Sequence, residues 1–209
     1  ANTTGVGNTA SGWQSMITNT TGSYNAASGY NSLKFNTTAS NNTAFGSNAL
    51  LANTTGTENV AVGANALAAA TADTNTAVGF WSGISTTTGG SNTMLGNRAM
   101  RANTTGANNV AVGRQALDAN TTASNNTAVG YASLDANTTA NNNTALGYQA
   151  LTTNTTGANN VAVGANASWG NTTGASNVSV GVQALNANSS GSNNVASGYQ
   201  ALYSNSTGA

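Results

Sequence analysis

The chain contains no cysteine, no proline and no histidine, and only 4% of its 209 residues are charged. Without cysteine, neither a disulfide framework nor a thiolate site can form. Four basic and four acidic residues give a net charge of zero, which argues against nucleic acid and anionic membranes as partners because both bind clustered Lys and Arg. No apolar run approaches the ~20 residues that span a bilayer. We therefore expect this segment neither to bind nucleic acid nor to insert into a membrane.

What the chain has in abundance is repetition. A phrase of the form Asn-x-x-x-Gly recurs twelve times at a step of 17 residues, and one step is a residue shorter. Self-similarity at a short period indicates units that pack on their neighbours. We therefore treat residues 1–209 as a single solenoid array. Its repeats begin at Asn8, Asn25, Asn42, Asn59, Asn75, Asn92, Asn109, Asn126, Asn143, Asn160, Asn177 and Asn194.

Each repeat position has its own residue preference, counted from the leading Asn as position 1. Position 3 is Ala in ten copies, position 4 is mostly Val or Leu, and position 9 is Leu or Met in ten. Position 5 is always glycine, which predicts a positive φ or a close approach by another segment. Asn at positions 1 and 12 suits turn geometry, because Asn tolerates the left-handed region. The position-5 glycines are Gly12, Gly29, Gly46, Gly63, Gly79, Gly96, Gly113, Gly130, Gly147, Gly164, Gly181 and Gly198.

The phrase Asn-Val-Ala-Val-Gly predicts a strand of three or four residues that ends in a tight turn. We expect one coil per repeat, built from two short strands and two turns, because positions 6 to 11 are too short for a stable helix. Twelve coils stacked ~4.8 Å apart would form a rod of roughly 55–60 Å. The predicted fold class is all-β, a parallel β-solenoid. The shortened repeat that begins at Asn59 should be absorbed in the turn at residues 70–74, since its strand phrase is intact.

Strand alternation predicts an apolar stripe on the outside of the coil. If the position-3 alanines point inward, the position-4 side chains point outward, and a continuous exposed apolar stripe indicates a partner surface. We expect self-association of identical chains along it. The competing arrangement, with the stripe inside and alanine outside, would permit a monomer. The position-4 stripe comprises Val62, Val78, Leu95, Val112, Val129, Leu146, Val163 and Val180.

Chemistry-bearing side chains are few. The only carboxylates are Glu58, Asp73, Asp118 and Asp135. Glycosidases need two carboxylates facing each other across a substrate, but the 17-residue spacing of Asp118 and Asp135, with Arg101 one repeat earlier, favours a ladder of solvated surface charges. Calcium-binding rolls need an aspartate in every repeat. We expect no catalytic residue, no cofactor and no metal site.

Two further patterns have a functional and a structural interpretation. Aromatic side chains at position 6 would bind glycans or pack over the turn, and we favour packing; these are Trp13, Tyr30, Phe80, Tyr131, Tyr148 and Tyr199. Asn-Thr-Thr matches the N-glycosylation pattern, although turn chemistry explains it without a sugar. The candidate glycosylation sites are Asn19, Asn36, Asn53, Asn103, Asn120, Asn137, Asn154 and Asn171.

The phrases NVAVG, NTAVG and NTALGYQAL, the last at residues 143–151, resemble the head repeats of trimeric autotransporter adhesins (YadA-like) and the repeat-rich shafts of tail-fibre-like proteins. The resemblance covers all twelve repeats. It implies a trimer of left-handed β-rolls in an extracellular, cell-surface or virion-borne fibre, with a host-surface or glycan receptor as partner. The adhesin heads have a shorter repeat, so the NTTG segment would be an added loop. Within residues 1–209 we recognise no segment like the neck, stalk or anchor of those families.

Two functions remain open. The first is a non-enzymatic, structural and adhesive fibre segment, either cut from a longer array or stacking end to end, because both ends fall inside the repeat. The second is ice binding, since some ice-binding proteins are Thr- and Asn-rich β-solenoids. Adjacent threonines in an extended strand face opposite sides, and position 2 is Thr in only part of the array. Both features favour the fibre.

Overall fold

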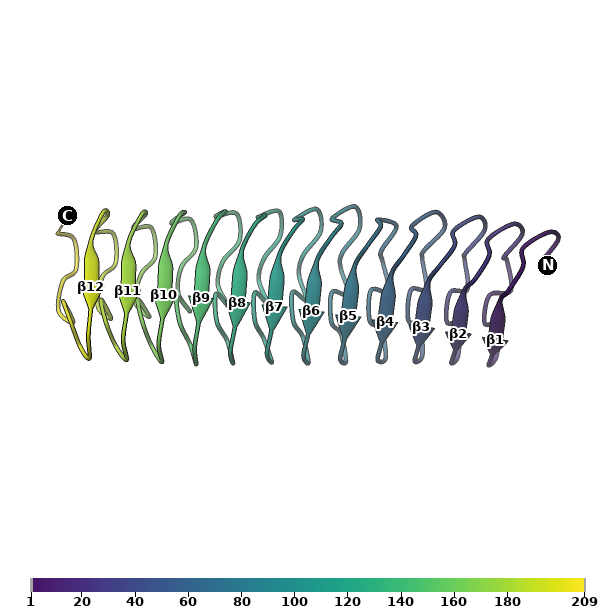
Figure 1. The fold of residues 1–209 in the computed structure, drawn as a ribbon, viewed down its shortest axis with the longest axis horizontal. Coiled ribbons are helices and arrows are strands. Elements are labelled where there is room, and N and C mark those ends of the chain that lie inside the picture. Colours follow the sequence, from purple (N-terminus) through teal and green to yellow (C-terminus); the bar gives the residue numbers. More distant parts are fainter. Residues whose placement is uncertain (1, 209) are drawn as a thin grey trace.

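The computed structural model describes residues 2–208, which form a rod with its two ends far apart (Figure 1). Twelve strands of three residues each make one parallel sheet in which the strand order follows the chain. The predicted parallel β-solenoid with one strand phrase per coil is therefore confirmed. We number the coils 1 to 12 by their strands. These are β1 (Thr9–Ser11), β2 (Ala26–Ser28), β3 (Thr43–Phe45), β4 (Val60–Val62), β5 (Thr76–Val78), β6 (Thr93–Leu95), β7 (Val110–Val112), β8 (Thr127–Val129), β9 (Thr144–Leu146), β10 (Val161–Val163), β11 (Val178–Val180) and β12 (Val195–Ser197).

The short repeat leaves the strand register unchanged. Val60 of β4 pairs with Thr76 of β5, as equivalent positions do elsewhere in the sheet. The missing residue is at position 14, where Thr71 is followed directly by Ala72. The hydrogen bond between position-13 residues of successive coils is present from coil 4 to coil 5: Thr71 N donates to Thr87 O at 2.9 Å. The prediction that residues 70–74 absorb the deletion is confirmed.

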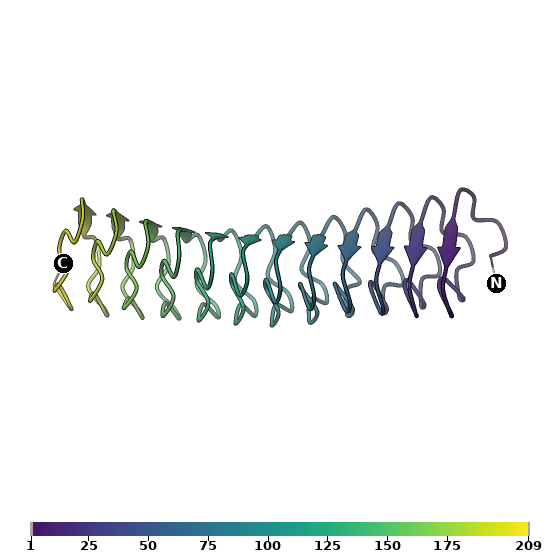
Figure 2. The ribbon, with the colours of Figure 1, turned by 90° about the horizontal axis from the view of Figure 1, so that it is seen from below.

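Each coil contains one strand and not the two that we expected. Positions 5 to 12 form successive turns: Ser15 N donates to Gly12 O at 3.3 Å, and Asn19 N donates to Met16 O at 3.2 Å. Figure 2 shows the strands along one side of the rod and the turns along the other. Residues 2–208 contain no helix, and hence none that could span a membrane. The NTT segment, at positions 12 to 14, begins where these turns end and forms a bend, so strand alternation does not apply to it.

Four residues per coil have positive φ. Position 5 needs glycine for two reasons: Gly113 has a φ of 133°, and an added Cβ would lie 2.5 Å from Gly130 O in the next coil. Both predicted roles of this glycine therefore hold. The left-handed region is also occupied at positions 7, 9 and 17, as by Asn48, Leu50 and Asn41. Asparagine at positions 1 and 12 is not left-handed, so that reason for its occurrence was wrong. The turn interpretation holds at position 12, where the side chain caps its own backbone: Asn53 Nδ2 donates to Gly56 O at 2.8 Å, and Asn53 Oδ1 accepts from Gly56 N at 2.9 Å.

The interior has an apolar half. Position 3 is buried from coil 2 to coil 12, and the alanines or serines at position 8 and the leucines at position 9 lie beside it, as Ala128, Ser133 and Leu134 do in coil 8. Position 4 faces outward; Val129, for example, is 37% exposed. The competing arrangement, with the stripe inside the coil, is therefore excluded.

The remainder of the interior is a ladder of buried amides. The Oδ1 of each position-1 asparagine accepts the backbone N–H of the asparagine that leads the next coil, at 2.9 Å between Asn8 and Asn25. This bond repeats through all eleven steps to Asn194. Burying an unpaired amide is costly, and here each acceptor is used. The ladder thus provides an acceptor for the backbone N–H of position 1, which lies just before the three-residue strand.

A second ladder runs through position 12. Asn36 Nδ2 donates to Asn19 Oδ1 at 2.7 Å. The two ladders meet at the carbonyl of position 15: Ala39 O accepts from Asn25 Nδ2 at 2.8 Å and from Asn36 Nδ2 at 3.1 Å. Unlike the first ladder, this one is interrupted: among residues 2–208, Asn36 Oδ1 is buried without a hydrogen-bond partner, and coils 4 and 5 carry Ala70 and Thr86 at position 12.

Exceptions at position 3 are matched by exceptions at position 9 of the preceding coil. Met94 replaces alanine, and its Sδ lies 2.6 Å from where a Cβ at Gly83 would be. Ser179 also replaces alanine, and its hydroxyl bonds Ser168 Oγ at 2.9 Å. Gly83 and Ser168 are the two copies without Leu or Met at position 9. The side chain of position 9 therefore packs on position 3 of the next coil, and the two vary together.

Candidate interaction surfaces

The rod offers outer faces and no cavity. Residues 2–208 enclose no detected pocket, and within the same range no three His, Cys, Asp or Glu side chains gather. The exposed surface of the chain is 7965 Å², a little below the roughly 8,800 Å² typical of a globular monomer of 20.4 kDa. A single chain therefore buries a normal share of its surface without a partner.

The position-4 stripe lies on the outward face of the sheet. Its exposed members, such as Val78 and Val180, are 40% and 41% exposed, and Leu95, Val112 and Val163 are half-buried. Neighbouring coils thus already cover more than half of each side chain. Position 2 projects from the same face, where Val and Thr occur in irregular order. The stripe is continuous in space, as the strand alternation predicts.

Position-6 aromatics inside the rod are partly buried, as packing predicts: Tyr131 is 37% exposed and Tyr148 52%. Exposure reaches 69% at Trp13 and 73% at Tyr199 in the two end coils, which each lack one neighbouring coil. The neighbouring Tyr131 and Tyr148 rings stack on each other, with their centres 5.4 Å apart and their planes at 16°. The Arg114 guanidinium lies 5.6 Å from the centre of the Tyr131 ring. At Tyr131, where Tyr148 and Arg114 both lie against the ring, mainly the ring edge is left for a ligand.

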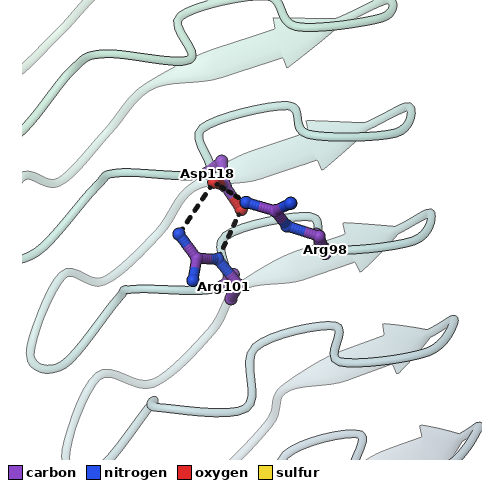
Figure 3. A network of polar contacts seen from close by, with 3 residues as sticks. All are labelled: Arg98, Arg101 and Asp118. Atoms are coloured by element: carbon purple, nitrogen blue, oxygen red, sulfur yellow. Dashed lines mark hydrogen bonds and ion pairs between the residues drawn. The ribbon is translucent and has the colours of Figure 1, made fainter.

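One carboxylate, that of Asp118, is buried where we expected solvated charges. The Asp118 carboxylate accepts from Arg98 Nη2 at 2.9 Å and from Arg101 Nε at 3.0 Å and Nη2 at 3.1 Å (Figure 3), and Asp118 is only 5% exposed. The expectation of a surface ladder is wrong for this residue. Arg98, three residues before Arg101, was missed because it occupies a different repeat position.

The neighbouring carboxyl has no such partner. Burial, reinforced by the nearby Asp118 charge, raises the pKa of Asp135 above its ordinary value. The hydrogen bond to Asp118 raises the pKa of Arg101, so this guanidinium stays charged. Asp118 pairs with both Arg98 and Arg101, whereas within residues 2–208 no ion pair to Asp135 is formed. The cluster is a local charge network and does not enclose a substrate site.

The candidate glycosylation asparagines all lie at position 12, in the buried second ladder. Asn103, Asn120 and Asn137 are each 0% exposed. Their side-chain amides donate to carbonyl groups, as Asn120 Nδ2 does to Ala123 O at 3.1 Å. A sugar on Nδ2 would compete with these bonds, so attachment would have to precede folding. Glycosylation stays a prediction under that constraint.

Comparison with known proteins adds no relative. No protein-family model matches this chain, and neither a curated protein nor a solved structure is similar to it.

Proposed function

We propose that this chain is a non-enzymatic structural and adhesive segment of an extracellular or virion-borne fibre, and that it self-associates along the position-4 stripe. The observation that carries the proposal is the outward, continuous stripe on a rod of regular coils. Large exposed apolar patches mark partner surfaces. Identical chains with identical periods match such a stripe coil for coil, which makes a second copy the natural partner.

Burial of the stripe alone would give only a weak association. Fully burying a Val or Leu side chain stabilises by roughly 1.5–3 kcal/mol, and only about two-fifths of each stripe residue is left to bury, so each adds about 1 kcal/mol. Association costs about 4–15 kcal/mol, which eight such residues barely offset. The stripe therefore needs help from its flanks.

Area leads to the same conclusion. At ~4.8 Å per coil and ~3.3 Å per residue, eight three-residue strands present roughly 400 Å². A stable interface buries about 800 Å² per partner. Three chains packed around an axis would bring position 6 into contact as well. A left-handed coil and a trimer, which the resemblance of the repeats implies, are the form that we propose.

Charge substitutions separate an interface from an inert face. In the chain with Val112→Asp and Val129→Asp, unpaired charges at the stripe should abolish association, while circular dichroism keeps its β signal. The matched control places Asp at position 14 of the same two coils, as Thr122→Asp and Thr139→Asp. Sedimentation velocity should show loss of the oligomer in the first variant only. Equal loss in both, or no loss in either, would refute the stripe as the interface.

A further inference from the structure

A second regular surface lies on the bend at positions 13 and 14, which positions 5 to 12 separate from the strand before it and positions 15 to 17 and position 1 of the next coil from the strand after it. We call it the threonine face. It comprises Thr87, Thr88, Thr104, Thr105, Thr121, Thr122, Thr138, Thr139, Thr155, Thr156, Thr172 and Thr173, at positions 13 and 14 of coils 5 to 10. Every position-14 residue in it is exposed. We propose that this face binds ice.

The threonine face is rigid. In coil 7 the carbonyl oxygen of Thr121 accepts three donors from coil 6: Thr104 N at 2.8 Å, Thr105 N at 3.2 Å and Thr104 Oγ1 at 3.0 Å. The Oγ1 bond recurs at every step of the face, ending with Thr172 to Ser189 O at 2.9 Å. These bonds fix the backbone and the position-13 rotamers. The face has little conformational entropy to lose on binding.

The hydroxyl groups of position 14 are free to bind water. Among residues 2–208, none of the position-14 threonines of the face has a side-chain hydrogen bond, and all are exposed. From residue 87 to residue 207, positions 13 to 17 carry no charged or aromatic side chain. The face thus lacks the cations that recognise phosphate and carboxylate and the rings on which sugars stack.

Geometry connects these hydroxyls to a water lattice. Equivalent atoms in adjacent coils lie ~4.8 Å apart, and a hydroxyl–water hydrogen bond is ~2.8 Å long, so one water can bridge two neighbours with an O···O···O angle of about 118°. That angle is close to the tetrahedral geometry of fully hydrogen-bonded water. Bridging waters would form a straight row in which each molecule has two donors or acceptors left for the next layer. An ice surface holds water molecules at fixed, regular positions that such a row can join, whereas a disordered solute does not.

The original objection to ice binding does not hold for this face. It assumed that Asn-Thr-Thr is an extended strand whose two threonines face opposite sides. In the structure the strand is at positions 2 to 4, and the threonine pair lies in a bend where position 14 is exposed and position 13 is half-buried in five of the six coils. The inference does not depend on self-association, because the position-4 stripe is on a different face.

The test is thermal hysteresis, together with partition of the purified chain into slowly growing ice. The wild-type chain should show both activities. Thr105→Tyr with Thr173→Tyr places two bulky rings on the face and should remove most of the activity. The matched control, Asn97→Tyr with Ala165→Tyr, places the same rings at position 6 of the same two coils. Position 6 already carries Tyr131 and Tyr148, so the control should fold and retain activity.

A milder variant asks whether the hydroxyl itself matters. Thr122→Val, Thr139→Val and Thr156→Val keep the shape and remove the free hydroxyls, so hysteresis should fall while the unfolding midpoint stays the same. Absence of hysteresis in the wild type would overturn the inference, as would equal losses in the face and control variants. Retention on insoluble crystalline polysaccharide without ice activity would assign the face to that ligand instead. Light scattering on the same samples keeps this result separate from that of the stripe.

Discussion

Coils 4 and 5 (residues 59–91) and coils 7 to 9 (residues 109–159) share one register but differ inside. In coils 7 to 9, positions 3, 9 and 12 are always Ala, Leu and Asn. Coils 4 and 5 have lost position 14 once, carry Ala70 and Thr86 in place of the second asparagine ladder, and have Gly83 in place of Leu. The leading asparagine and the position-5 glycine are unchanged in both regions.

The difference separates strict positions from tolerant ones. The first asparagine ladder and the column of position-5 glycines, which we call the glycine column, run through the short coil without a break. The second ladder stops there, and the sheet keeps its register. Strand pairing and the position-1 amide therefore set the coil, whereas positions 9, 12 and 14 adapt to their neighbours.

The largest effect is expected at the glycine column. Gly113→Ala adds a Cβ 2.5 Å from a backbone oxygen at a φ of 133°, and it should destabilise by at least about 3 kcal/mol through strain and the clash. Gly79→Ala in the irregular region should cost the same. Gly90→Ala at position 16 is the control, because Ala107 occurs naturally there in the next coil and an added Cβ would come no closer than 3.1 Å to another atom. Urea unfolding measures all three, and a tolerated Gly79→Ala would show that the short coil relaxes the constraint.

Next in size is the paired exception of Met94 and Gly83. Met94→Ala should cost about 2–4 kcal/mol, because no side chain at Gly83 can fill the space. Gly83→Leu alone overpacks the same space and should cost about 1–3 kcal/mol. The double variant recreates the common Ala–Leu pair and should lie within about 1 kcal/mol of the wild type. Additive losses in this double-mutant cycle would mean that the two side chains do not compensate.

The two amide ladders should then differ in strength. Asn126→Ala leaves the buried N–H of Asn143 without its acceptor, at 2.9 Å in the wild type, which should cost about 2–3 kcal/mol. Asn120→Ala breaks the second ladder, which already tolerates Ala70, and about 1 kcal/mol is expected. Chemical denaturation of the two single variants makes the comparison. A larger loss for Asn120→Ala would reverse the ranking.

The smallest effect concerns the charged cluster. Because folding raises the pKa of Asp135, the folded chain binds this proton more tightly, and stability is gained as pH falls through the folded pKa. Asp135→Asn should therefore be slightly more stable than the wild type at pH 7, and that gain should vanish in acid. Asp118→Asn should be less stable at pH 7, since two arginines lose their partner. Thermal unfolding at several pH values distinguishes these signs.

The sequence predicted the repeat register, the strand phrase, the position-5 glycines and the opposite directions of positions 3 and 4, because each follows from local backbone geometry. Which of positions 3 and 4 faces inward was decided only by the structure. It did not reveal the asparagine ladders. Asparagine is common in turns, and only stacked coils place Asn25 Oδ1 beside the backbone N–H of Asn42. An Asn at position 1 of all twelve repeats was the available signal, since a turn would accept Asp, Ser or Gly. Arg98 was missed because it reaches Asp118 from another repeat position.

Light scattering of the wild-type chain over a dilution series tests the central claim, that the position-4 stripe joins identical chains. We expect a mass three times that of one chain, falling only at high dilution. A stable single-chain mass at every concentration would contradict the proposal.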